Sequence, residues 1–188
     1  MATKVAVLVG SLRKGSFTRQ VAEAVAKLTP QLQFEFIEIG ALPHYNQDLD
    51  PDNAPAQWVA FRNKVRATDA VLWATPEYNR SVPGVLKNAL DVGSRPYGKS
   101  VFDAKPAAII SVSPGALGGF GANHHLRQSL TFLNMPALQQ PEAYLGGVSK
   151  WFNESGALTD ESATKFLTNF GAKFADWIAS HPKVEARA

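Results

Sequence analysis

Hydroxyl groups and a guanidinium gather in residues 10–18, which read Gly-Ser-Leu-Arg-Lys-Gly-Ser-Phe-Thr and join an apolar run to the start of a predicted helix. The first amides of a helix lack partners within the helix and lie at the positive end of its dipole, so such a position can bind an anion. Ser11, Ser16 and Thr18 contribute hydroxyl donors, and Arg13 contributes a planar cation that can bind two phosphate oxygens. The segment is therefore a candidate phosphate site. It has neither the ending of a Walker motif nor the G-x-G-x-x-G dinucleotide pattern.

Two further segments carry residue types that suit a planar ligand. Residues 75–84 read Thr-Pro-Glu-Tyr-Asn-Arg-Ser-Val-Pro-Gly, and the two prolines stiffen this loop. Glu77, Tyr78 and Asn79 offer an acceptor, an aromatic face and exposed backbone amides, which could border the edge of a heterocycle. Residues 113–122 contain four glycines, which permit positive φ angles and a close approach of the backbone to a ligand.

Each of the three segments also has a simpler interpretation. In the first, Ser16 only caps a helix, and Arg13 and Lys14 are solvated. In the second, Asn79 satisfies the backbone of an ordinary turn. The third is then a flexible connection. Taken singly, the segments leave these alternatives open.

Short apolar runs alternate with stretches of helical periodicity along the whole chain. Strands are expected at residues 4–9, 34–39, 69–75 and 106–112 and within residues 136–145. Helices are expected from the Ser16 cap to about residue 30, around residues 58–65, at residues 85–92 and 123–133, and after Thr159 or Asp160.

This alternation predicts an α/β fold with a parallel sheet that helices cover on both faces. No internal repeat or linker interrupts it, so we expect one domain over residues 1–188. Ligands of such sheets bind beyond the carboxyl ends of the strands, near the point where the strand order reverses. The three segments follow the first, third and fourth strands, so we expect them to meet at one edge of the sheet and to share a site.

Composition excludes several other kinds of chemistry. The chain has no cysteine, which rules out disulfides, thiolate metal ligands and cysteine nucleophiles. The adjacent pair His124 and His125 lacks the spacing of a zinc site, so a helix-surface or interface role is the better interpretation, and no metal is expected. The sequence also lacks a G-x-S-x-G elbow, which argues against a hydrolase triad.

Charge and hydropathy limit the partners and the location. The net charge of +3 is spread along the chain without a basic run, so nucleic acid is not an expected partner. The apolar runs are too short to cross a bilayer. The N-terminus leads directly into the first predicted strand without a signal-peptide pattern, and a cytoplasmic location is therefore expected.

The first two segments together resemble the motifs of the NADPH-dependent FMN reductase family, and among its members the bacterial chromate and quinone reductases in particular. The resemblance extends over most of the chain, including residues 86–91, which read Leu-Lys-Asn-Ala-Leu-Asp, and residues 111–121. It implies a flavodoxin-like, five-stranded parallel sheet of order 2-1-3-4-5 and a tightly but non-covalently bound FMN. It also implies a homodimer or homotetramer.

The resemblance assigns FMN contacts residue by residue. They are Ser11, Arg13, Ser16, Phe17 and Thr18 for the phosphate, Pro76, Glu77, Tyr78 and Asn79 for the isoalloxazine, and Ser113 and Gly115 for completing the ring site. Thr18 departs from the pattern, because relatives commonly carry Asn there. A threonine keeps a hydroxyl group but has a shorter reach.

An FMN enzyme of this kind takes hydride from NADPH or NADH and passes electrons to quinones or similar acceptors, with chromate, azo compounds and free flavin as other candidates. The flavin carries the redox chemistry, so no side chain is assigned as a catalytic acid or base. One site would serve both substrates in a ping-pong cycle. The rival interpretations are a flavodoxin-type electron carrier, whose sequence is typically acidic, and an FMN-binding sensor that does not oxidise NAD(P)H.

One further residue is predicted to bind substrate. Residues 93–103 read as an irregular insertion, which we expect to shape the mouth of the site. Arg95 in this insertion would attract the phosphates of NAD(P)H or an anionic acceptor. The alternative is that Arg95 and Lys99 are solvated charges on a surface loop.

Overall fold

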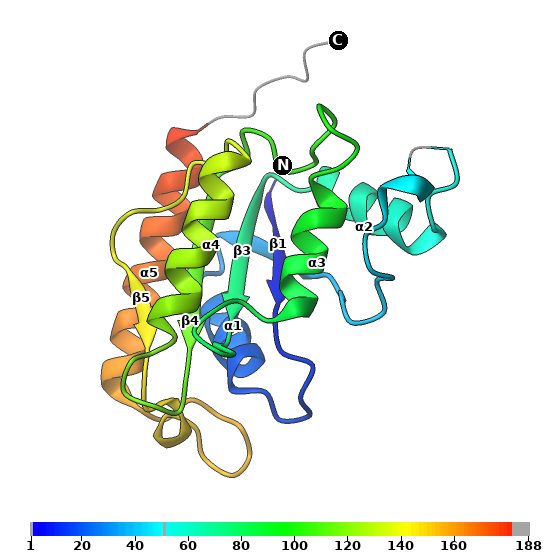
Figure 1. The fold of residues 1–188 in the computed structure, drawn as a ribbon. Coiled ribbons are helices and arrows are strands. Elements are labelled where there is room, and N and C mark those ends of the chain that lie inside the picture. The colour runs from blue at the N-terminus through cyan, green and yellow to red at the C-terminus, as the bar shows by residue number, and fades with distance from the viewer. Residues whose placement is uncertain (1, 51, 182–188) are drawn as a thin grey trace.

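A five-stranded parallel sheet forms the centre of the computed structural model, which describes residues 2–50 and 52–181 (Figure 1). The strands are β1 (Thr3–Val9), β2 (Leu32–Phe36), β3 (Ala70–Thr75), β4 (Ala107–Val112) and β5 (Ala143–Leu145). Their order is β2-β1-β3-β4-β5, and every neighbouring pair is parallel. The predicted flavodoxin-like sheet and its strand order are confirmed.

The three central strands are apolar because both of their faces are covered. Every residue of β3 and β4 is buried, as are the last five residues of β1. β2 lies at the edge and begins two residues earlier than predicted. Its pairing with β1 ends at Phe36, after which Ile37 and Ile39 turn into the core on the other side of the sheet. β5 has only three residues and begins after Pro141, in agreement with the restriction that proline places on strands.

The helices cover the two faces of the sheet unequally. α1 (Phe17–Leu28) and α5 (Glu161–Ser180) pack together on one face. α2 (Ala56–Arg66), α3 (Gly84–Gly93) and α4 (Phe120–Phe132) cover the other face. Two short 3₁₀ turns, η1 (Gln47–Leu49) and η2 (Val148–Lys150), lie in the connections.

The starts of the helices follow local capping chemistry. Oγ of Ser16 accepts a hydrogen bond of 3.2 Å from the Arg19 amide and so caps α1 as predicted. Asp160, one of the two predicted candidates, caps α5 through a bond of 2.8 Å from the Ala163 amide. α4 begins three residues before the predicted start, because Gly119 adopts a left-handed conformation and allows the helix to begin directly after the glycine-rich loop.

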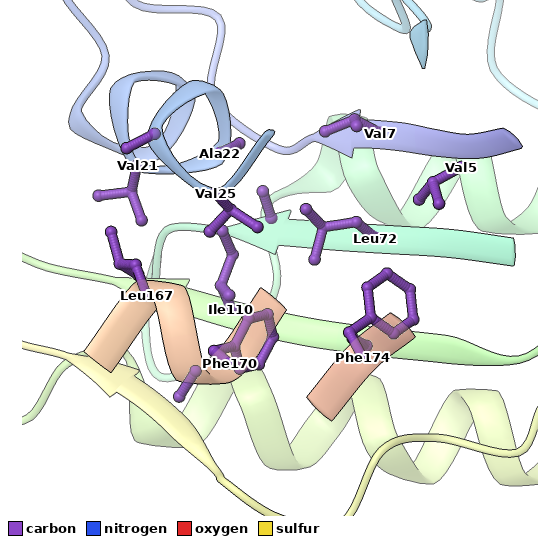
Figure 2. Close-up of a cluster of buried hydrophobic side chains, with 14 of the residues drawn as sticks. Val5, Val7, Val21, Ala22, Val25, Leu72, Ile110, Leu167, Phe170 and Phe174 are labelled. Carbon is purple, nitrogen blue, oxygen red and sulfur yellow. The ribbon is translucent and has the colours of Figure 1, made fainter. Parts of the chain in front are cut away.

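Two separate hydrophobic clusters stabilise the two faces. One joins alternate residues of the central strands to α1 and α5, and it includes Val25, Leu72, Phe170 and Phe174. Figure 2 shows side chains from both helices meeting over the strands. The other cluster contains the opposite face of the same strands together with α2, α3 and α4. The period of two along a strand makes this division possible.

The segment between β2 and α2 is fixed by buried polar contacts. Asp50 and Arg62 form a two-pronged ion pair with N···O distances of 3.0 and 2.5 Å, and both side chains are almost fully buried. Nε of Arg62 also donates to the Val92 carbonyl at 2.8 Å. These charge-assisted bonds give both buried charged groups a partner. Because Arg62 belongs to α2 and Val92 to α3, the bonds link the segment to both helices.

The insertion of residues 93–103 is anchored by apolar side chains. Phe102 is fully buried and contacts Trp73 of β3, with ring centroids 5.2 Å apart. The ring of Phe102 occupies the space beside Gly93, where a β-carbon would lie 2.3 Å from Cε2. α3 runs antiparallel to the strands, so this insertion lies at the amino-terminal edge of the sheet (Figure 1).

The packing of Phe102 against Gly93 predicts an asymmetric effect of two glycine-to-alanine changes in α3. Gly93→Ala should lower the free energy of unfolding by about 1–3 kcal/mol, since the added methyl group forces the buried ring to move. Gly84→Ala is the matched control at the other end of the helix, where no atom lies within 4 Å of the added carbon. It should leave stability unchanged or raise it by up to about 1 kcal/mol. Urea unfolding of both variants measures the difference, and equal losses would contradict this account of the packing.

Candidate functional site

The three predicted loops meet at the carboxyl edge of the sheet, as Figure 1 shows. Their contacts confirm that they adjoin. A β-carbon on Gly10, at the end of β1, would lie 3.3 Å from the Pro76 ring in the second loop. A β-carbon on Gly121, which belongs to the third predicted segment and lies in the first turn of α4, would lie 2.7 Å from the Arg80 carbonyl oxygen. The absence of side chains at these glycines allows the loops to approach one another closely.

The first loop surrounds the start of α1 and borders a depression of about 470 Å³. The amides of Phe17 and Thr18 are the first two of the helix, so neither has a carbonyl one turn earlier in the helix to bind. Together with the positive end of the helix dipole, they suit an anion. The residues lining the depression are Ser11, Leu12, Arg13, Lys14, Gly15, Ser16, Arg19, Gln20, Glu23 and Glu38.

The cationic side chains around this depression differ in whether a carboxylate already pairs with them. Arg19 is paired with Glu38 at the end of the neighbouring segment and lies 3.8 Å from Glu23. Arg13 and Lys14, in contrast, have exposed side chains on the wall of the depression. The first loop therefore presents two cations beside the free amides of α1, which is a suitable donor set for a phosphate group.

The second loop is a tight hairpin. Tyr78 and Ser81 exchange two backbone hydrogen bonds, each 3.0 Å long. Asn79 and Arg80 lie between them with φ angles of 51° and 63°, the pair of left-handed residues that a type I′ turn requires. Asn tolerates this conformation well, whereas an arginine there is uncommon and must be held by its surroundings. The side chain of Tyr78 is half exposed at the hairpin.

The third loop, residues 113–119, is fixed by the segment that follows β5. The Ser113 amide donates to the Leu145 carbonyl at 2.9 Å, and the Ser113 hydroxyl accepts from the Gly115 amide at 3.0 Å. A β-carbon on Gly146 would lie 2.8 Å from the Gly115 carbonyl oxygen. The predicted pair Ser113 and Gly115 thus lies at the carboxyl end of β4, close to a fourth loop that begins at Gly146.

Apolar side chains stand exposed around the same edge. Leu12, Tyr78, Leu117 and Phe120 each expose half or more of their side-chain surface, and they come from the three loops and the start of α4. Phe120 is part of an aromatic cluster with His124 and Tyr144. Exposed apolar groups gathered in one region are typical of a binding surface.

Tyr144 in this cluster keeps its proton. Burial raises the pKa of its hydroxyl group to about 12, and the adjacent Glu142 carboxylate contributes in the same direction. The hydroxyl group donates to Oε1 of Glu142 at 2.7 Å and lies 3.0 Å from Nε2 of His124. Tyr144 therefore stays protonated to a higher pH than an ordinary tyrosine does.

Most of the predicted site residues lie at this edge, and the positions of three of them need separate description. Phe17 and Thr18 do not line the depression with their side chains: Phe17 packs against the core, and Thr18 is buried. Their amides are what they offer to a phosphate. Arg95 follows the end of α3 and lies at the opposite edge of the sheet, because a helix of ten residues spans about 15 Å. The structure does not bring Arg95 to the three loops within one copy of the chain.

Sequence reasoning missed several residues that line the depression or adjoin the three loops. Arg19, Gln20, Glu23 and Glu38 line the depression, although only the first three lie near the predicted motif in the sequence. Gly146 was also missed. The Gly-Gly pair after the fifth predicted strand carried a signal for a fourth loop at the same edge.

The described residues, 2–50 and 52–181, hold no group of three or more His, Asp or Glu side chains that could bind a metal ion. Among the same residues, no helix combines the length and apolar character needed to cross a membrane.

Residues 3–150 match the sequence pattern of the NADPH-dependent FMN reductase family. The chain belongs to this family. A quinone reductase of Pseudomonas putida is 57% identical over 175 residues, which cover 93% of this chain and 94% of the relative. A 2-hydroxy-1,4-benzoquinone reductase of a Burkholderia species is 46% identical over 179 residues, with 95% and 97% coverage.

A solved structure supports the same relationship. FerB, a flavoenzyme NAD(P)H:(acceptor) oxidoreductase of Paracoccus denitrificans, superposes with a TM-score of 0.90 at 42% identity, and the match covers 96% of this chain and all of FerB. The predictions of an oxidoreductase with FMN as cofactor and NAD(P)H as donor are confirmed. The residues present fit FMN, since a phosphate-type donor set and a rigid hairpin lie at one sheet edge.

The first loop predicts that Arg13 distinguishes FMN from riboflavin. A well-placed guanidinium–phosphate bond contributes about 1.5–3 kcal/mol, so Arg13→Ala should weaken FMN binding by roughly one to two orders of magnitude. Riboflavin lacks the phosphate, and its affinity should change little. The measurement is a titration of the apoprotein with each ligand.

Lys27→Ala is the matched control for this titration, because it removes a cation from the last turn of α1, at the end of the helix away from the first loop. It should leave both affinities unchanged. Equal losses for FMN and riboflavin in Arg13→Ala would indicate general damage to the loop and contradict the assignment.

Proposed function

We propose that this protein is an NAD(P)H:quinone oxidoreductase in which one FMN site serves donor and acceptor in turn. The observation that carries the proposal is the arrangement of an anion-binding helix start, a rigid hairpin and exposed apolar side chains at one sheet edge. The names of the two bacterial relatives, a quinone reductase and a 2-hydroxy-1,4-benzoquinone reductase, support a quinone as acceptor.

The chain would hold FMN at two ends. For the phosphate we assign the amides of Phe17 and Thr18 together with Ser11, Arg13 and Ser16. For the ring we assign the backbone of Pro76, Glu77, Tyr78 and Asn79 on one side and of Ser113 and Gly115 on the other. This division follows from the supports of the two regions: α1 packs in one hydrophobic cluster, whereas α3 and α4, which adjoin the hairpin, pack in the other.

When bound, FMN supplies hydride acceptance from NAD(P)H and two-electron transfer to the acceptor. The protein contributes binding and orientation. Amides of the hairpin and of the glycine-rich loop would face the negative charge that reduction places on the ring, where fixed dipoles stabilise it. The half-exposed Tyr78 and the exposed Leu117 and Phe120 would provide an apolar wall for a planar acceptor. A quinone needs two electrons and two protons, of which hydride brings both electrons and one proton and water can bring the other.

Other features of the function are proposed with different support. An open ring site also suits azo compounds, free flavin and chromate as acceptors.

We propose a single-domain protein that works in the cytoplasm as a homodimer or homotetramer. Phe132 on α4 is 71% exposed and would lose that contact with water at an interface between copies, which supports self-association. Light scattering of the purified protein measures the mass of the assembly.

Steady-state kinetics distinguish the reductase from an electron carrier or a sensor. The protein should purify yellow, release FMN on heating, and lose its visible absorbance when NADPH is added without oxygen. Added quinone should restore the absorbance through many turnovers, and double-reciprocal plots at several quinone concentrations should give parallel lines. A carrier or sensor would show no repeated NADPH oxidation. Intersecting lines together with product-inhibition evidence for a ternary complex would contradict the shared site.

A further inference from the structure

The first turn of α4 is capped by a side chain from a different loop. Its own N-cap residue, Gly119, has no side chain that could bind the free amides. Instead, Oε2 of Glu77 accepts a hydrogen bond of 3.0 Å from the amide of Ala122, the third residue of the helix. A carboxylate at the start of a helix also interacts favourably with the helix dipole. Glu77 therefore joins the hairpin of the second loop to α4.

Two further contacts hold the hairpin at the same place. The Arg80 carbonyl oxygen packs so closely against Gly121 that a β-carbon there would lie 2.7 Å away. Oγ of Ser81 lies 2.9 Å from Nδ1 of His125, one turn further along the helix. The left-handed residues of the hairpin are thus held between a hydrogen bond on one side and a close backbone contact on the other.

α4 is itself a rigid support because polar bonds attach it to the sheet. Nδ2 of the fully buried Asn123 donates to Oγ of Ser111 in β4 at 3.2 Å. Ser111 in turn donates to the Ala143 carbonyl in β5 at 3.2 Å. Arg127 donates to Oδ1 of Asn123 at 3.0 Å and completes the chain of bonds. A hairpin attached to this turn of α4 has a fixed position relative to the sheet.

The ion pair between Glu77 and Arg80 is a weaker interaction than the cap. The two charged groups are 4.0 Å apart, and the Arg80 side chain is 75% exposed, whereas that of Glu77 is 16% exposed. Exposed pairs at such distances contribute little. The Ala122 amide is therefore the contact that gives the Glu77 carboxylate its position.

We propose that Glu77 is a positioning residue for the flavin: its carboxylate caps α4 and thereby fixes the hairpin whose backbone borders the isoalloxazine ring. This inference rests on the proposed placement of FMN. It differs from the expectation that the Glu77 side chain serves as an acceptor at the ring, because the carboxylate binds the Ala122 amide of α4. Gly121 contributes to the same positioning of the hairpin, since only glycine allows the Arg80 carbonyl to approach the helix so closely.

Flavin titrations of the apoprotein test this role without relying on turnover. Glu77→Ala removes the cap and should weaken FMN and riboflavin binding by the same factor, roughly tenfold, because both ligands carry the ring. Gly121→Ala should give the same equal loss by displacing the hairpin. Glu77→Gln keeps an oxygen acceptor and should restore both affinities to within about threefold of the wild type. The visible circular dichroism of bound FMN should change in the first two variants and return toward the wild-type spectrum in the third.

Glu161→Ala is the matched control, since it removes an exposed carboxylate from the first turn of α5 on the other face of the sheet. It should change neither affinity nor spectrum. Loss of FMN binding alone in Glu77→Ala, or wild-type affinities and spectra in both Glu77→Ala and Gly121→Ala, would overturn the positioning role while leaving the proposed function intact. A wild-type apoprotein that binds neither flavin would overturn the proposed function and this inference with it.

Discussion

Parallel pairing in register of β1, β3 and β4 is the constraint on which the site depends. Val9 pairs with Ala74, and Thr75 pairs with Ser111, so the three strands end at nearly the same level. The loops that follow must therefore begin side by side, whatever their sequences. Shifting one strand by a single residue would turn its side chains to the wrong face and move its loop out of line. The burial of both faces of these strands makes such a shift costly and so protects the site.

Convergence of several loops at one edge requires small residues where backbones approach. Gly10 contacts the beginning of the second loop, Gly118 lies against the backbone of Tyr144, and Gly121 lies against the Arg80 carbonyl. Each glycine lacks the β-carbon that would separate its neighbours. The loops are thereby held by contacts with one another as well as by their strands. This explains how a loop with left-handed Asn79 and Arg80 keeps one conformation.

The sequence predicted the features that local chemistry determines. Apolar runs located the central strands, and Ser16 and Asp160 located the starts of α1 and α5. The strand order came from the family resemblance, because periodicity carries no information on which strands pair. The end of β2 and the start of α4 were each misplaced by three residues, since the first depends on pairing with β1 and the second on the conformation of Gly119. The partner of Glu77 could not be predicted, because it lies 45 residues away in the chain.

The two hydrophobic cores place the two ends of the site on different supports. The phosphate-binding loop leads into α1, which packs with α5 in one cluster. The hairpin leads into α3 and is capped against α4, and both of these helices belong to the other cluster. The sheet lies between the two clusters. A ligand that contacts both the start of α1 and the hairpin therefore bridges two faces of the molecule, so its binding stabilises each face against local opening by mass action. An elongated cofactor with a phosphate at one end and a ring at the other suits such a divided site better than a small anion or a ring alone.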